Sequence, residues 1–337
     1  MQQLIKPEGQ QIEALEKIKN WLKFPTKQFT LGGYAGTGKT SLIKHIRDLI
    51  SPFSAVVTYT NKAASVLRSK GISDAITIFR LMYKLIDEDN MIWHKLNELE
   101  VDVVIVDEAS MLGQSIRTDL ESYGVPIIYI GDPGQLPPIN EESVMDKCDF
   151  TLTEVRRHGD KILEVAMAIR ENRPYPDVDQ FSLSDADLSS ADIVICYTNN
   201  RRANLNQRIR KHRGLNGPPQ KGDRVLSAKT NYNHGVFSGE IGTLIYHNGK
   251  RRFEILFDGW DEPVVFTNGH MLVPNENPYA VDLKGRDCID FAYAMTAHKC
   301  QGSKFDKVIV WEEQRSDARW KYNAATRAVK ELIMAGR

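Results

Sequence analysis

Hydrophobic residues in the first 150 positions occur in short unbroken runs instead of alternating with polar residues. The runs at 29–33, 54–60, 101–106 and 125–131 are rich in β-branched side chains. Such runs are typical of strands that are buried on both faces of a sheet. The segment 40–50 places its apolar residues at helical spacing, and helical patterns separate the other runs as well. This order predicts an α/β fold around a parallel sheet.

The pattern changes at about residue 222, after the stretch 213–223, which is rich in glycine and proline. Short strand-like segments then follow one another at 222–229, 239–247, 251–257, 262–266 and 270–274. Their junctions contain the dipeptides Asn248-Gly249, Asp258-Gly259 and Asn268-Gly269. These dipeptides favour tight hairpin turns, in which both central residues need a positive φ. We therefore predict a small antiparallel barrel over residues 213–285.

The α/β pattern returns at 290–311 and continues to the end of the chain. Its return indicates that the barrel interrupts a second α/β unit. The predicted domains are a first core at 1–150, a second core formed by 151–212 and 286–337, and the inserted barrel.

The segment "GGYAGTGKT" at 32–40 matches the phosphate-loop pattern, with Gly33 followed after four residues by Gly38, Lys39 and Thr40. Glycines let successive backbone amides point at phosphate oxygens, Lys39 supplies a positive charge to the β and γ phosphates, and the Thr40 hydroxyl can ligate Mg²⁺. The predicted helix after the loop would present its N-terminus to the anion. A glycine-rich turn before a helix is the plainer alternative. The pattern predicts a nucleoside triphosphate with Mg²⁺, and Gly36 and Thr37 would also line the loop. A phosphate loop alone does not separate kinases, GTPases and motors.

Two later strands end in polar residues that suit the same chemistry. Asp107 and Glu108 follow the run at 101–106, where Asp107 could hold Mg²⁺ and Glu108 could deprotonate the attacking water. A solvated strand end is the alternative. Gln135, in "GDPGQLPP", could sense the γ phosphate, although this stretch also reads as an ordinary turn.

Charge and cysteine content restrict the partners and the compartment. The chain has 44 basic and 44 acidic residues, so a polyanion would have to bind a local groove. Its four cysteines form no C-x-x-C pair, which favours a reducing compartment and argues against a zinc site. No apolar run approaches the length of about 18 residues needed for a membrane span. We expect a cytoplasmic protein, in the host cytoplasm if the chain is phage-encoded, with no membrane partner.

The phosphate loop, "DEAS" and "GDPGQLPPI" are followed by "LTEVRRHGDKILEVAMAIREN", "AMTAHKCQGSKFDKVIV" and "YNAATRAVKELI". In order and spacing this set resembles the motor motifs of superfamily 1 DNA helicases, and most of all the RecD-like branch that includes the phage Dda helicases. The resemblance implies two RecA-like cores that close on MgATP, with single-stranded DNA across both, 5′ to 3′ movement and duplex unwinding. It also implies that the barrel is SH3-like and that residues 83–98 form a wedge hairpin.

The resemblance assigns further nucleotide contacts. Gln10 matches the glutamine that reads the adenine edge, and Arg157 and Arg327 match arginines that reach the γ phosphate. A planar guanidinium suits the charge that develops in phosphoryl transfer. Arg156, beside Arg157, is not expected to play this part. Gly302, with its neighbours Gln301 and Ser303, would link DNA to nucleotide.

Residues on both cores resemble the DNA-contacting motifs. They are Thr60, Asn61, Lys62, Thr77 and Phe79 in the first core, and Thr296, His298 and Lys299 in the second. Short hydroxyl, amide and backbone donors can bind phosphates without reading bases. Phe79 stands where relatives often carry histidine, so a stacking platform and a core residue both stay open.

Two aromatic residues have two interpretations each. Trp93, with Met91, would be the apolar wedge of the hairpin, or Trp93 would anchor a small hairpin as a buried residue. Phe237 and the basic stretch 250–253 could line the path of the strand, or the barrel could be purely structural.

The resemblance implies a monomer whose partners are single-stranded DNA and the junction with duplex, and proteins of replication, recombination or repair. Two alternatives stay open. One is a nucleic-acid-stimulated ATPase switch that displaces bound proteins. The other is a motor directed to RNA, because motifs that contact the phosphate backbone do not distinguish ribose from deoxyribose.

Overall fold

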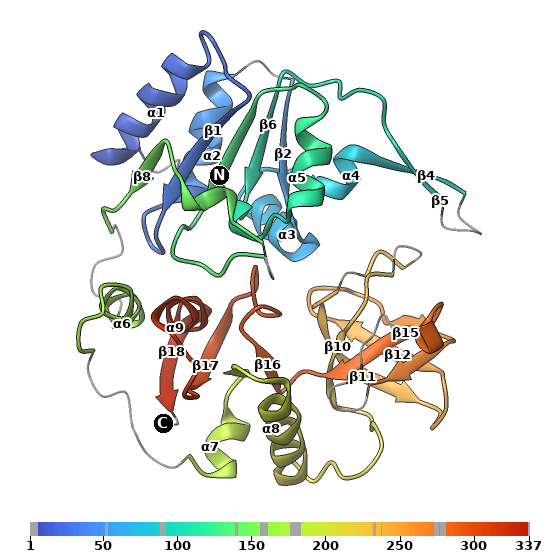
Figure 1. The fold of residues 1–337 in the computed structure, drawn as a ribbon. Coiled ribbons are helices and arrows are strands. Elements are labelled where there is room, and N and C mark those ends of the chain that lie inside the picture. The colour runs from blue at the N-terminus through green and yellow to red at the C-terminus, as the bar shows by residue number, and fades with distance from the viewer. Residues whose placement is uncertain are drawn as a thin grey trace. The chain divides into compact units, whose positions relative to one another are not determined.

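The computed structural model describes residues 6–50, 53–87, 92–138, 141–155, 161–175, 183–231, 234–236, 238–272, 276 and 281–335. The chain forms two compact units, residues 1–164 and 165–337 (Figure 1). The helix α6 (Lys161–Arg170) contains the boundary between them. No helix in the described ranges is long and apolar enough to cross a membrane.

The first unit is built on a six-stranded sheet with the order β3-β2-β6-β7-β1-β8. Every neighbouring pair in it is parallel. The strands are β1 (Gln28–Gly33), β2 (Ser54–Thr58), β3 (Ile76–Thr77), β6 (Val103–Asp107), β7 (Ile127–Gly131) and β8 (Phe150–Leu152). β8 crosses the boundary that we predicted between residues 150 and 151, and it pairs with β1.

Helices cover both faces of this sheet. α1 (Gln10–Trp21), α2 (Lys39–Leu49) and α3 (Asn61–Ser69) contribute to one apolar cluster. α4 (Ile78–Met82), α5 (Gln114–Glu121) and the short 3-10 helices η1 (Ala109–Met111) and η2 (Val144–Asp146) contribute to the other. Alternate residues of β6 enter the two clusters, which explains the unbroken apolar run. Each buried aliphatic side chain contributes about 1.5–3 kcal/mol.

A two-stranded antiparallel ladder follows α4. It consists of β4 (Tyr83–Asp87) and β5 (Ile92–Lys95), with Tyr83 opposite Lys95 and Leu85 opposite Trp93. Figure 1 shows the pair extending away from the parallel sheet. Met91 lies outside the described residues.

The second unit contains a four-stranded parallel sheet with the order β16-β9-β17-β18. Its strands are β9 (Ile193–Cys196), β16 (Ala294–Thr296), β17 (Phe305–Trp311) and β18 (Ala328–Ala335), and its helices include α7 (Asp185–Ser190), α8 (Asn199–His212) and α9 (Ala318–Ala325). Residues of α7 and α8 pack on β9 in one apolar cluster. The predicted α/β class with two parallel-sheet cores is thus confirmed.

Between β9 and β16 the chain forms a six-stranded sheet with the order β13-β12-β11-β10-β15-β14. All pairs are antiparallel except β14 with β15. The strands are β10 (Arg224–Ser227), β11 (Ile241–His247), β12 (Phe253–Phe257), β13 (Val264–Phe266), β14 (Gly269–Met271) and β15 (Asp287–Phe291), and the 3-10 helix η3 (Val281–Leu283) precedes β15. β15 falls in the range that we assigned to the second core.

Two of the three predicted tight turns have the expected conformation at glycine, because φ is 75° at Gly249 and 81° at Gly259. The turn expected at Asn268-Gly269 is wrong, since Gly269 has no positive φ and begins β14. A Cβ at this position would collide with the ring of Phe253 and lie 3.1 Å from the carbonyl oxygen of Arg251. Gly269 is therefore needed for close packing and not for a turn.

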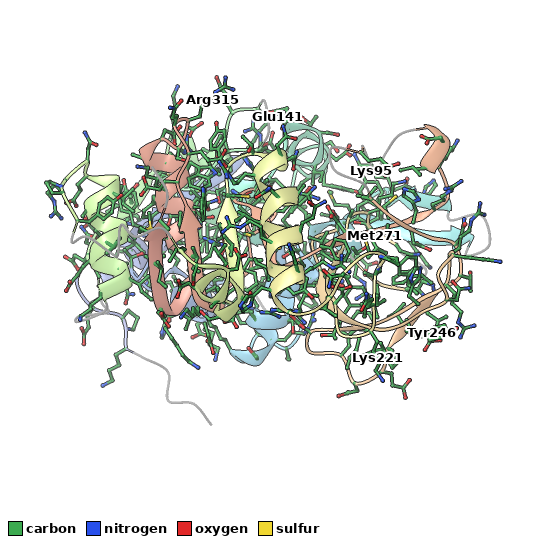
Figure 2. The ribbon with its side chains drawn as sticks, turned by 90° about the horizontal axis from the view of Figure 1, so that it is seen from below. Lys95, Glu141, Lys221, Tyr246, Met271 and Arg315 are labelled. Carbon is green, nitrogen blue, oxygen red and sulfur yellow. The ribbon has the colours of Figure 1, made fainter. Side chains whose placement is uncertain are left out.

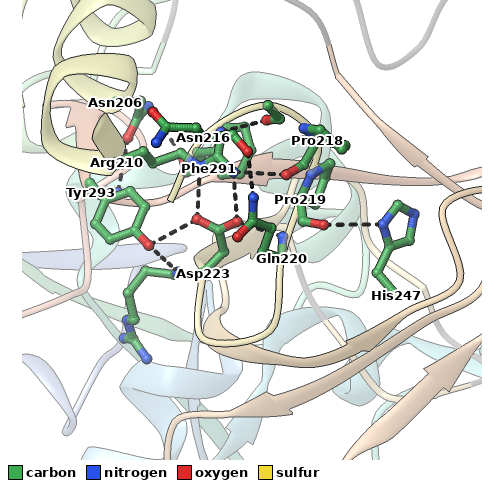
Figure 3. A network of polar contacts seen from close by, with 12 residues as sticks. Asn206, Arg210, Asn216, Pro218, Pro219, Gln220, Asp223, His247, Phe291 and Tyr293 are labelled. Atoms are coloured by element: carbon green, nitrogen blue, oxygen red, sulfur yellow. Dashed lines mark hydrogen bonds and ion pairs between the residues drawn. The ribbon is translucent and has the colours of Figure 1, made fainter. Parts of the chain in front are cut away.

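A buried ion pair fixes the six-stranded sheet to α8 (Figure 3). Asp223 is 0% exposed and accepts from Arg210 Nε at 2.8 Å and Nη2 at 2.9 Å. It also accepts from the Tyr293 hydroxyl at 3.0 Å and from the backbone amide of Gln220 at 2.8 Å. The Arg210 guanidinium lies 4.0 Å from the centroid of the Phe291 ring. The carboxylate thus accepts four hydrogen bonds, two of them from the guanidinium that balances its charge, as a buried ion pair requires.

We expect Asp223→Ala to lower the free energy of unfolding by about 3–5 kcal/mol, because it leaves Arg210 buried without its counter-charge. Urea denaturation followed by tryptophan fluorescence measures this change. The matched control is Asp306→Ala in the same unit, where Asp306 pairs with Lys330 at 2.7 Å between exposed side chains. Its loss should change the free energy of unfolding much less than the loss of Asp223 does, because water screens an exposed pair. Equal effects of the two substitutions would contradict the role of Asp223.

Candidate functional site

Two glycines shape the loop that joins β1 to α2. Gly36 has φ 81° and Gly38, directly before the helix, has φ 83°. A Cβ at Gly36 would lie 2.6 Å from Leu163 Cδ2, and a Cβ at Gly38 would collide with the Gln11 amide. Both positions therefore need glycine for conformation and for space. The α2 N-terminus has no side-chain cap, as is expected where backbone amides bind an anion.

Lys39 and Thr37 point back over their own loop. Lys39 Nζ donates to the carbonyl oxygens of Gly33 and Tyr34, the latter at 3.0 Å, and lies 4.0 Å from Asp132 Oδ2. Thr37 Oγ1 donates to the Tyr34 carbonyl oxygen at 2.8 Å. Thr40 is the second residue of α2. The ammonium thus lies at the mouth of the loop, between the carbonyl groups and a buried carboxylate.

The end of β6 carries the two adjacent carboxylates. Asp107 is 7% exposed and accepts from the Glu108 backbone amide at 3.0 Å. Burial, followed by the charge of Glu108, raises the pKa of Asp107 to about 7, although that hydrogen bond and the charge of Lys39 act in the opposite direction. Glu108 has φ 55°, an unusual value for a residue other than glycine. Asp107 and Glu108 place two adjacent carboxylates at this strand end, and a divalent cation would neutralise their negative charge. The residues therefore fit Mg²⁺.

The end of β7 joins this group. Asp132 is buried, and its Oδ1 accepts from the Gly134 amide at 2.9 Å. Ser110 Oγ donates to Gln135 Oε1 at 3.5 Å, so Gln135 contacts the "DEAS" segment. Because β1, β6 and β7 are neighbours in a parallel sheet, their carboxyl ends bring these residues to one edge, where α/β sheets bind ligands.

Gln10 and Gln11 have different partners. Gln10 Nε2 donates to Thr153 Oγ1 at 3.0 Å, and its Oε1 accepts from the amides of Thr153 and Glu154 at 2.7 and 3.0 Å. Gln11 is 4% exposed, and its Nε2 donates to the carbonyl oxygen of Thr37 in the phosphate loop at 3.0 Å. We gave Gln11 no role. The sequence does contain one feature that could have indicated its role: Gln11 is a polar residue on the same face of α1 as the buried residues Ala14 and Ile18.

The threonines expected to contact DNA in the first unit also cap helices. Thr60 Oγ1 accepts from the Ala63 amide at the start of α3, and Thr77 Oγ1 accepts from the Arg80 amide at the start of α4. Asn61 and Lys62 form the first turn of α3 and are partly exposed. These groups follow the adjacent strands β2 and β3, so they lie at one edge of the sheet.

Phe79 is partly exposed and stacks on Tyr83, with ring centroids 4.5 Å apart and an interplanar angle of 18°. The ring is therefore neither fully buried nor free of protein contacts. Trp93 lies in β5, but its side chain is outside the described residues, as are Phe237 and Arg157.

The expected DNA and linking residues of the second unit form one turn after β16. Thr296 ends the strand, and its carbonyl oxygen accepts from the Cys300 amide. Burial lowers the pKa of His298 and of Lys299, and the charge of Asp290 opposes the shift at Lys299. Gly302 has φ 72°, and the Ser303 amide donates to the Cys300 carbonyl oxygen.

Arg327 connects this turn to the end of α9. Its guanidinium donates to the carbonyl oxygen of Asn323 at 3.1 Å, to that of Ser303 at 3.5 Å and to Thr326 Oγ1 at 3.2 Å. It is 3% exposed, and within the described ranges no carboxylate pairs with it. A buried charge without a counter-charge is costly, and an anion would relieve that cost.

A phosphate loop followed by a helix, with acidic residues at the ends of two neighbouring parallel strands, defines a phosphate-loop nucleoside triphosphatase. A family model described as "AAA domain" matches residues 8–186, and one described as "UvrD-like helicase C-terminal domain" matches residues 291–335. The chain belongs to the AAA domain family.

The ATP-dependent RecD2 DNA helicase of Deinococcus radiodurans is 25% identical over 91% of this chain and 46% of its own length, so the chain spans about half of that relative. An uncharacterized protein of Acanthamoeba polyphaga mimivirus, R530, is 31% identical over 34% of this chain and 30% of its own length. The two family models and the RecD2 relative confirm the resemblance to superfamily 1 helicases of the RecD-like type.

Solved structures of Pif1 helicases share the fold. One, of two coordinating Pif1 helicases at forked double-stranded DNA, has a TM-score of 0.62 at 18% identity and covers 98% of this chain and 92% of its own. Pif1 from Bacteroides with ADP-AlF3 and single-stranded DNA has a TM-score of 0.60 at 18% identity and covers 96% of this chain and 91% of its own. Pif1 from Candida albicans has a TM-score of 0.58 at 19% identity and covers 98% of this chain and 94% of its own.

The different partners of the two glutamines predict different substitution effects. Gln11→Ala should weaken the binding of ATP and GTP alike, by about fivefold, because it removes one hydrogen bond to the loop backbone. Gln10→Ala should weaken ATP more than GTP if Gln10 reads adenine. Calorimetric titration of both nucleotides into both variants measures this, and each variant is the control for the other. If Gln11→Ala weakened the binding of one nucleotide much more than the other, Gln11 could not act only by supporting the backbone of the phosphate loop.

Proposed function

We propose that the chain is an ATP-dependent DNA helicase that moves 5′ to 3′ on single-stranded DNA and unwinds duplex. The observation that carries the proposal is that Lys39, the Asp107-Glu108 pair, Asp132 and Gln135 meet at one sheet edge. The motif order and the printed name of the RecD2 relative support the choice of a DNA helicase among phosphate-loop enzymes.

The first unit would bind MgATP through the residues described above. The loop at Gly33, Gly36, Thr37 and Gly38 would cradle phosphates, and Lys39 would lie against the β and γ phosphates. Thr40 and Asp107 would hold Mg²⁺, which supplies charge neutralisation on the phosphate oxygens. Gln10 would contact adenine, although its amide also binds Thr153 and Glu154.

Hydrolysis would depend on three kinds of group. Glu108 would accept a proton from the attacking water. Gln135 would contact the γ phosphate, and its hydrogen bond with Ser110 would connect that contact to the "DEAS" segment. Arg157 and Arg327 would stabilise the charge of the transition state. Arg327 is suited to this because its charge has no carboxylate partner within the described ranges, and because it binds the turn that carries Gly302 and Ser303.

DNA would bind through backbone contacts. The donors would be Thr60, Asn61, Lys62 and Thr77 with Phe79 on the first core, and Thr296, His298 and Lys299 on the second. A neutral chain is compatible with such a local groove. The β4–β5 pair would be a wedge hairpin with Trp93 at the duplex, and the six-stranded sheet would be an SH3-like barrel with Phe237 near the strand. The motor would act as a monomer.

The first experiment measures steady-state ATP hydrolysis with and without single-stranded DNA, with RNA of the same sequence and with Lys39→Ala as the blank. Strong stimulation by DNA alone supports the proposal, and duplexes with 5′ or 3′ tails then test direction. Stimulation by RNA alone would favour the RNA-directed motor. A basal rate that neither strand changes would favour an ATPase switch with another trigger.

Glu108→Gln should reduce ATP hydrolysis by at least about 100-fold, because it removes the general base. Binding of ATP and of single-stranded DNA should be retained, since the amide has nearly the same shape. Phosphate release and fluorescence anisotropy measure the two quantities. Hydrolysis at the parental rate would show that another group deprotonates the water.

Trp93→Ala should reduce unwinding of a forked duplex more than it reduces hydrolysis stimulated by single-stranded DNA, because only unwinding needs the wedge. Tyr246→Ala, at a side chain 46% exposed on the six-stranded sheet, is the control. A parallel loss of both activities in Trp93→Ala would instead identify Trp93 as a structural anchor of the hairpin.

A further inference from the structure

One carboxylate on α5 holds both strands of the β4–β5 hairpin at their base. Tyr83 is the first residue of β4 and Lys95 is the last of β5, and the two lie opposite each other in the ladder. The Tyr83 hydroxyl donates to Asp119 Oδ2 at 2.5 Å, and Lys95 Nζ donates to Asp119 Oδ1 at 2.9 Å. Each oxygen of the carboxylate thus binds one strand, and together the two hydrogen bonds restrain the Tyr83–Lys95 pair at the base of the hairpin.

Further contacts reinforce this attachment. Lys95, labelled in Figure 2, also donates to Ser122 Oγ at 3.0 Å and lies 5.2 Å from the centroid of the Tyr123 ring. The Tyr123 hydroxyl donates to the Met82 carbonyl oxygen at 3.1 Å, directly before β4. The Leu96 amide, directly after β5, donates to the same oxygen at 2.8 Å. The base of the hairpin is therefore bound to α5 and to the turn after it.

The protonation states keep the direction of these bonds fixed. Hydrogen bonds from Tyr83 and Lys95 lower the pKa of Asp119, so its carboxylate is ionised at neutral pH. Burial and the neighbouring Asp119 raise the pKa of Tyr83 to about 12, so the phenol stays a donor. Charge-assisted hydrogen bonds of this kind are stronger than neutral ones.

The same helix connects to the candidate nucleotide site. Glu108 is followed by η1 and Gly113, and α5 begins at Gln114. Glu141, labelled in Figure 2, accepts from the Gln114 amide at 2.5 Å and fixes the first turn of α5. The buried residues Ala109 and Leu112 pack this connection into the core of the unit. Glu108 is therefore joined to α5 by a short connection that is buried in the core.

Tyr83 also contacts the predicted DNA surface, through its stacking on Phe79. Three elements thus meet at this residue: the first turn of α4, the base of the hairpin and the C-terminal part of α5.

We propose that Asp119 is a positioning residue that holds the hairpin in a fixed orientation on the helix that follows Glu108. Asp119 touches neither nucleotide nor DNA in this role. It couples changes at the nucleotide site to the hairpin, so that hydrolysis is converted into strand separation. The role depends on the proposed helicase function.

The test compares Asp119→Ala with a matched control, Asp74→Ala. Asp74 pairs with Arg47 at 2.7 Å in the same unit, and its side chain is 51% exposed. For Asp119→Ala, the number of base pairs unwound per ATP hydrolysed should fall about tenfold, while hydrolysis stimulated by single-stranded DNA stays within about twofold of the parent. Asp119→Glu should recover part of the loss, and Asp74→Ala should match the parent.

Hydrogen exchange provides a readout that does not depend on helicase activity. Asp119→Ala should speed the exchange of the paired amides in β4 and β5 and leave those of β6 and β7 unchanged. Faster exchange throughout the parallel sheet would indicate general destabilisation and would overturn the proposal. So would parental unwinding per ATP in Asp119→Ala, or equal losses of unwinding and hydrolysis.

The two proposals can fail separately. A parent chain that hydrolyses ATP but unwinds no duplex overturns the proposed function, and the role of Asp119 with it. A parent that unwinds duplex, with an Asp119→Ala variant that unwinds equally well per ATP, overturns only the role of Asp119.

Discussion

The burial of a parallel sheet on both faces determines where the chemistry of the first unit can take place. Alternate residues of β6 and β7 enter opposite apolar clusters, so neither face can carry a polar site. Only the ends of the strands are free to hold charged groups. Because all strands run in the same direction, the loops after β1, β6 and β7 emerge at one edge, and Lys39, Asp107 and Asp132 meet there.

The unbroken apolar runs made this part of the fold predictable. They specify strands buried on both faces, and the phosphate-loop and acidic motifs lie directly after them. Long-range choices were not predictable in the same way. Gly269 looked like a turn residue beside Asn268, but a ring from a neighbouring strand decides its role. Gln11 binds Thr37, which lies 26 positions away, and Asp119 binds Tyr83, which lies 36 positions away. No local sequence pattern predicts contacts over such separations.

Helix caps show why local motifs and site residues are hard to separate. We predicted DNA contacts for Thr60 and Thr77, and each hydroxyl already accepts a backbone hydrogen bond at a helix N-terminus. The two roles are compatible, because a hydroxyl that accepts one bond can still donate another to a phosphate oxygen. The cap fixes the side chain, and this reduces the entropy lost on binding. A residue can therefore serve the fold and the proposed function with the same rotamer.

Two buried arginines of the second unit illustrate the difference between a structural charge and an available one. Arg210 has a bidentate carboxylate partner and backbone carbonyl oxygens around it, so its charge is fully used within the protein. Arg327 is equally buried, but its described partners are carbonyl and hydroxyl oxygens. These neutral acceptors orient the guanidinium without cancelling its charge. An anion that reached Arg327 would therefore gain its full electrostatic attraction, whereas one near Arg210 would first have to compete with Asp223.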